Sequence, residues 1–403
     1  MRTASSHFAP LDGLRGLAIL MVIATHTIDG PGRTGVENGM FLIAKTGWTG
    51  VTLFFALSGF LISGILLDTR HRKQSLRSFL ARRSLRIFPI YFGFLAAYFF
   101  LLPHVFPSLP RVAPHERIYY WTYLTNIKQW LSGSLAGCPP LAPLWSLSVE
   151  EQIYLAWPLL ILFLPARQLG PLFAALAVGS VVWRIMAFRS GMPTLWIYTW
   201  TPGNIEPFAY GGLVAWLSRN PGGQRLLKLW SLPICLCAGL TILTFIGIYH
   251  HFNLWSNSYF MMTAGMSLSA IFAASLIALT ITTRDSALLN RCLSWSMLRY
   301  TGRFSYAMYL FHVTVIVLLR PYFQHPTSIG GGGASRPVLL LALYAAVCAV
   351  SFGAAAISWF GFESHFLKLK RFFPSGGRVV RLSPAEEPGP VPVTSVPPSL
   401  TGI

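Results

Sequence analysis

The sequence contains few charged residues, and acidic residues are the scarcest of them. Asp, Glu, Lys and Arg together make up 11% of the 403 residues, and 12 acidic residues stand against 31 Lys and Arg. Because a soluble domain carries roughly 25% charged residues, this composition excludes an ordinary soluble fold. The high share of hydrophobic residues, 54%, instead predicts an integral membrane protein.

Cysteine is also scarce, and the five cysteines have no spacing typical of a disulfide framework. We predict no metal site. Four of them lie in apolar or basic segments, where core packing is expected: Cys235, Cys237, Cys292 and Cys348. Only Cys138 is expected on the outer side of the membrane.

Ten apolar runs are long enough to predict membrane-spanning helices. They lie at approximately 12–28, 40–67, 86–102, 142–164, 171–188, 205–218, 230–249, 258–282, 304–320 and 337–360. The predicted fold class is therefore all-α, a polytopic membrane helix bundle. We expect a membrane domain over 1–372 and a disordered tail over 373–403, where Pro, Gly, Ser and Val follow without periodicity.

The positive-inside rule accounts for most of the formal net charge of +19. Lys and Arg concentrate in alternate connections between the apolar runs, and the positive-inside rule then predicts that both termini are cytoplasmic. The remaining attraction would be for anionic membrane lipid. The sequence contains none of the folded basic modules that bind nucleic acid, so no nucleic-acid partner is expected.

Two polar residues share one face of the first predicted helix. Arg15 and His26 are separated by ten residues, which places both side chains on one stripe about 16 Å apart along the axis. Ionisable groups at membrane depth usually face a cavity or pathway. A snorkelling Arg15 with an interfacial His26 explains the pattern equally well.

Two further segments carry polar residues beside apolar runs. Arg83 and Arg86 are three residues apart on one helix side, where two guanidinium groups suit phosphates. An ordinary positive-inside cluster is the favoured interpretation from these residues alone. Adjacent Glu150 and Glu151 begin an apolar helix and point to different sides of it, so at most one faces His26.

Several segments resemble the acyltransferase 3 family of integral membrane acyltransferases. The matching segments are Leu11 to Gly16 with His26, Gly50 to Ile62, Arg82 to Tyr91, Pro143 to Pro158, Glu206 to Ala215, Gly302 to His312, and Glu363. The chain departs from the family pattern at Thr52, where an Asp is common. It departs again at Asn204, where an Arg is frequent.

The resemblance implies an O-acyltransferase that moves an acetyl or other short acyl group from cytoplasmic acyl-CoA to a hydroxyl of a cell-envelope carbohydrate. It implies His26 as general base and Glu150 as the carboxylate that orients it. The implied donor-binding residues are Arg15, Arg83 and Arg86. Residues assigned to acceptor binding or support are Asp12, Ser148, Gln152, Tyr154, Glu206, Tyr306 and His312.

The resemblance implies no bound cofactor, because acyl-CoA acts as a substrate, and a location in the bacterial inner membrane. Two alternatives remain open. The same machinery would acylate a small molecule such as a macrolide or glycolipid. From a different class, a proton-coupled organic-acid transporter would also place buried Arg, His and Glu in a helix bundle.

Overall fold

A computed structural model shows a helical bundle without strands over the residues that it describes. These residues are 8–28, 34–72, 74–132, 138–247, 258–324 and 336–373. Most of the predicted tail over 373–403 lies outside the described residues. The predicted fold class, an all-α membrane helix bundle, is confirmed.

The α-helices are α1 Ala9–Thr27, α2 Gly35–Lys45, α3 Thr49–Thr69, α4 Ser75–Phe100, α5 Leu102–Val105, α6 Arg117–Trp121, α7 Thr125–Ser132, α8 Leu144–Phe163, α9 Ala166–Arg189, α10 Thr194–Thr199, α11 Ile205–Leu217, α12 Pro221–Gly247, α13 Met266–Thr282, α14 Leu288–Leu293, α15 Ser296–Gln324, α16 Arg336–Ser358 and α17 Ser364–Lys368. Short 3-10 segments are η1 Thr46–Trp48, η2 Pro114–Glu116, η3 Pro139–Leu141, η4 Thr201–Asn204 and η9 Leu369–Phe372. The segments η6 Met261–Gly265 and η8 Trp359–Glu363 are π-helical.

Seven helical segments among the described residues are long and apolar enough to cross a membrane. The predicted spans at 12–28, 142–164 and 205–218 are helices too, namely α1, α8 and α11, but they are not among the seven. Polar residues lower the hydropathy of α1 and α8, and α11 has only 13 residues. The helix that contains the third predicted span is longer than that span, because α4 begins at Ser75.

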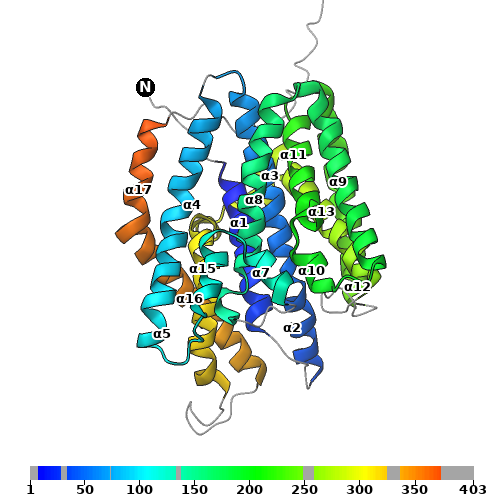
Figure 1. Cartoon of the computed structure of the whole chain (residues 1–403). Coiled ribbons are helices and arrows are strands. Elements are labelled where there is room, and N and C mark those ends of the chain that lie inside the picture. The colour runs from blue at the N-terminus through cyan, green and yellow to red at the C-terminus, as the bar shows by residue number, and fades with distance from the viewer. Residues whose placement is uncertain are drawn as a thin grey trace, which may run out of the picture.

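Helix α1 lies near the middle of the bundle and packs against α3, α15 and α16 (Figure 1). Pro10 in its first turn suits a helix start, because proline needs no hydrogen-bond partner for its nitrogen there. Glycines allow the close contact with α15. A Cβ built on Gly302 would lie 1.8 Å from the Asp12 carbonyl oxygen, and one on Gly16 would lie 2.1 Å from that of Leu298.

The connection between α4 and α8 is folded and buries several of its aromatic residues. Tyr123 stacks on Tyr91 of α4 with ring centroids 4.1 Å apart, and the Tyr91 hydroxyl donates to the Tyr120 carbonyl over 2.8 Å. Cys138 is buried here beside Tyr98, with 3.2 Å between sulfur and hydroxyl oxygen. The sequence predicted core packing for every cysteine except Cys138. This is wrong, because Cys138 is buried, whereas Cys237 and Cys292 are exposed.

Candidate active site

Five helices enclose a cavity of about 70 Å³, which we call the inner pocket. Its walls come from α1, α3, α4, α8 and α15. The polar residues that line it are Arg15, Ser58, Arg83, Arg86, Ser146, Glu150, Ser305, Tyr306 and Tyr309. The predicted donor-binding arginines and the predicted catalytic Glu150 therefore share one cavity.

Glu150 is held by a network of hydrogen bonds across three helices. Its Oε1 accepts from Ser58 Oγ at 2.5 Å and from Arg83 Nη2 at 3.1 Å. Tyr154, one turn along α8, donates from its hydroxyl to Ser58 at 2.9 Å and places its ring 3.6 Å from the Arg83 guanidinium carbon. This arrangement fixes the carboxylate and the guanidinium together.

His26 lies in a different polar group, next to His312 of α15. The two ring centroids are 5.0 Å apart in an edge arrangement. Among the described residues, Glu150 and His26 share no hydrogen bond, because Glu150 pairs with Arg83 and His26 bonds to its own helix. The interpretation that Glu150 orients the His26 imidazole is corrected accordingly.

Backbone carbonyls set the tautomer of both histidines. His26 Nδ1 lies 2.8 Å from the Val22 carbonyl oxygen, and His312 Nδ1 lies 2.7 Å from that of Tyr309. A carbonyl oxygen only accepts, so Nδ1 carries the hydrogen and Nε2 of the neutral ring keeps its lone pair. This is the form in which a histidine accepts a proton.

Tyr309 connects the two polar groups. It lines the inner pocket, and its ring centroid lies 5.4 Å from that of His312. Its hydroxyl shares a 2.6 Å hydrogen bond with Ser146 Oγ. Tyr309 and His312 thus form a chain of ring contacts that leads from the inner pocket to His26.

Two other predicted residues of α8 act as supports. Ser148 Oγ hydrogen-bonds to Thr125 Oγ1 at 2.7 Å. The Gln152 amide donates to Asn126 Oδ1 at 3.0 Å and to the Tyr123 carbonyl at 3.1 Å. These bonds tie α8 to the segment around α7, and neither residue lines the inner pocket.

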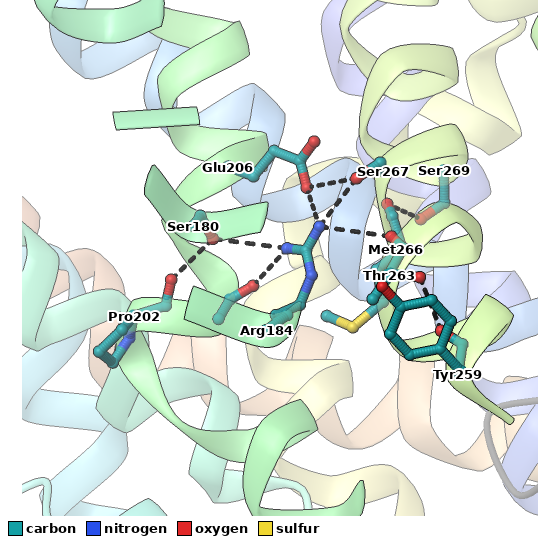
Figure 2. Close-up of polar contacts among 10 residues, drawn as sticks. Ser180, Arg184, Pro202, Glu206, Tyr259, Thr263, Met266, Ser267 and Ser269 are labelled. Atoms are coloured by element: carbon teal, nitrogen blue, oxygen red, sulfur yellow. Dashed lines mark hydrogen bonds and ion pairs between the residues drawn. The ribbon is translucent and has the colours of Figure 1, made fainter. Parts of the chain in front are cut away.

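Glu206 is fully buried in an ion pair with Arg184 of α9 (Figure 2). Ser267 of α13 hydrogen-bonds to both partners, at 3.1 Å from Glu206 Oε2 and 2.8 Å from Arg184 Nη2. Arg184 also donates to the Gly203 carbonyl at 2.8 Å. The group joins α9, α11 and α13, which makes Glu206 a supporting residue rather than one that lines the inner pocket.

Comparison with known proteins identifies the family. The family model described as an acyltransferase domain matches residues 8–359. The chain belongs to the acyltransferase 3 family. It is 29% identical over 340 residues to the peptidoglycan O-acetyltransferase OatA of Listeria monocytogenes, covering 80% of this chain and 51% of that protein.

Two other curated relatives show a similar match. The putative peptidoglycan O-acetyltransferase YrhL of Bacillus subtilis is 29% identical, over 79% of this chain and 50% of YrhL. The O-acetyltransferase OatA of Staphylococcus aureus is 26% identical, over 78% of this chain and 51% of that protein. The chain thus spans about half the length of these relatives. No solved structure matches the chain.

The sequence analysis missed three residues of this acyltransferase 3 protein. Ser58 stands in the Gly50 to Ile62 segment, which resembled the family without indicating a role for this serine, and Tyr309 stands in the segment that pointed to His312. Arg184 gave no signal beyond being a lone charge in an apolar run. It nevertheless supplies a guanidinium to Glu206, whereas Asn204 instead donates to the Tyr198 and Trp200 carbonyls.

Proposed function

We propose that this member of the acyltransferase 3 family transfers an acetyl or another short acyl group from cytoplasmic acyl-CoA to a hydroxyl of a cell-envelope carbohydrate, and that it does so in the bacterial inner membrane. The carbohydrate acceptor is supported by the relatives named as peptidoglycan O-acetyltransferases. Family membership favours this enzyme over the transporter alternative.

The observation that carries the proposal is the state of His26. Its Nδ1–H donates to the Val22 carbonyl, so Nε2 is the ring atom with a lone pair. In the proposed step, Nε2 takes the proton from the acceptor hydroxyl while that oxygen bonds to the acyl carbonyl carbon. The carbon–sulfur bond breaks, and the departing CoA thiolate takes the proton back from the imidazolium.

The donor is proposed to enter the inner pocket and to extend its acyl end past Tyr309 towards His26. Arg86 is the arginine available to it, because Arg83 is paired with Glu150. In this account Glu150 positions Arg83 and Ser58 and does not orient the base. Arg15, which lies 3.6 Å from Asp12 across one helical turn, supplies a third positive charge to the same cavity.

The proposal is tested with labelled acetyl-CoA supplied to inverted membrane vesicles that contain a carbohydrate acceptor. The wild-type protein is expected to label the acceptor, and His26→Ala is expected to lower the rate by about 10²-fold to 10⁴-fold, the usual value of a general base. His365→Ala, on the exposed face of α17, is the matched control. Solute flux without acceptor labelling would contradict the proposal.

A further inference from the structure

A second cavity, of about 460 Å³, lies where α1 and α15 begin and where η8 and the C-terminal segments return. We call it the basic vestibule. Its charged and aromatic lining includes Asp12, Arg86, Arg299, Arg303, Trp359 and Lys370. Its volume falls in the range of about 300–1,000 Å³ that is typical of small-molecule sites.

The vestibule collects positive charge from three parts of the chain, α4, α15 and η9. Its lining holds four cationic side chains and one carboxylate, Asp12, which also forms an ion pair with Arg15. Within the described residues, neither Arg86, Arg299 nor Lys370 forms an ion pair with a carboxylate. Like charges held around one cavity repel one another, and an anion between them would relieve that repulsion.

Specific contacts position two parts of the vestibule, the backbone of η9 and the Arg303 side chain. Arg82 of α4 donates from Nη1 to the carbonyl oxygens of Lys370 at 3.2 Å and Phe373 at 2.8 Å, which fastens η9 against α4. The Arg303 guanidinium carbon lies 4.6 Å from the Trp359 ring centroid. An orientation signal for the membrane needs only positive charge and no such arrangement.

The vestibule adjoins the inner pocket, because Arg86 lines both cavities. We propose that the basic vestibule binds the phosphorylated nucleotide end of acyl-CoA, with Arg299, Arg303 and Lys370 as phosphate ligands. The thin pantetheine arm then passes Arg86 and carries the acyl group through the inner pocket towards His26. This inference rests on the proposed function, since it assigns a second subsite to the same donor.

Truncated donors test the inference. Lys370→Ala and Arg303→Ala are each expected to raise the KM for acetyl-CoA about ten-fold, the value of a hydrogen bond to a charged group. Neither variant is expected to change the KM for S-acetyl-pantetheine, which has no nucleotide. Lys368→Ala removes the same charge from the exposed end of α17 and is expected to leave both constants unchanged.

Two results would overturn the assignment. Unchanged acetyl-CoA kinetics in both variants would remove the residues from the donor site. An equal rise in KM for both donors would indicate a general structural defect. Arg303→Ala also removes the packing of Arg303 on Trp359. Lys370→Ala is measured beside it because that variant leaves this packing intact.

An anionic lipid headgroup offers the same phosphate chemistry, so the assays are run in nanodiscs of phosphatidylcholine with and without phosphatidylglycerol. The rise in KM for acetyl-CoA is expected in both kinds of nanodisc. An effect seen only with phosphatidylglycerol would assign the vestibule to lipid and overturn the proposal.

Direct binding separates this inference from the proposed function. The adenosine bisphosphate head of CoA is titrated into wild-type, Lys370→Ala and Lys368→Ala protein in phosphatidylcholine nanodiscs. We expect binding by wild type and Lys368→Ala and about ten-fold weaker binding by Lys370→Ala. Binding without any acyl transfer would contradict the function alone, whereas transfer without this binding pattern would contradict the vestibule alone.

Discussion

At the scale of single residues, the two predicted catalytic groups, His26 and Glu150, make different contacts. His26 donates from Nδ1 to the Val22 carbonyl of its own helix, which fixes its tautomer, and its ring contacts His312. Glu150 instead forms a charge-assisted hydrogen bond with Arg83 and accepts from Ser58. The carboxylate therefore holds Arg83 and Ser58 at the inner pocket, and the proposed role of His26 as base does not depend on it.

This division of roles predicts unequal effects at two adjacent carboxylates. Glu150→Gln replaces the charged partner of Arg83 with a neutral amide, so kcat/KM for acetyl-CoA is expected to fall at least about ten-fold. Glu151→Gln, which breaks no hydrogen bond or ion pair among the described residues, is expected to have a smaller effect. Initial rates measured at several acetyl-CoA concentrations give kcat/KM for both variants. Equal losses of kcat/KM would refute the assignment of Glu150 as the partner of Arg83.

The sequence motifs indicated Arg83 and Glu150 as candidate site residues, and both line the inner pocket. Their roles, like that of His26, stay predictions. The sequence did not indicate that Arg83 and Glu150 pair, because they are 67 residues apart and lie on different helices, α4 and α8. The sequence did not indicate Arg184 for the same reason, because its partner Glu206 lies on another helix.

At the scale of elements, glycines set how closely α1 and α15 approach. Small residues indicate close helix packing in a membrane protein, but only the structure shows which backbone each glycine meets. Gly302 faces the Asp12 carbonyl, one turn from Arg15. The glycine therefore fixes the helix that carries Arg15 and His26 against the helix that carries Tyr309 and His312.

Gly302→Ala is expected to destabilise the protein by at least about 1–3 kcal/mol, the usual cost of overpacking. The added Cβ would lie 1.8 Å from backbone oxygen, which a side-chain movement cannot relieve. Gly353→Ala on α16 is the matched control, because nothing lies within 4 Å of its added Cβ. Thermal unfolding in detergent measures both, and equal Tm values for the two variants would contradict this packing.

At the scale of the whole molecule, the polar residues of the site are concentrated on helices that lie within the bundle. Figure 1 shows α1 and α8 in the middle, with α9 and α12 toward one side and α17 toward the other. Lipid cannot solvate charged side chains, so helices with Arg, His and Glu are stable when protein covers them. The same polar residues explain why α1 and α8 are helical without meeting the hydropathy of a membrane span.

The central claim is acyl transfer to an envelope carbohydrate with His26 as the base. It is tested most directly by mass spectrometry of the cell-envelope glycans from the native host after deletion of the gene, with complementation by wild type or by His26→Ala. The account predicts glycans that lose the mass of an acyl group on deletion, regain it with wild type and do not regain it with His26→Ala. Glycans that are identical in all strains, or fully restored by a well-expressed His26→Ala protein, would contradict it.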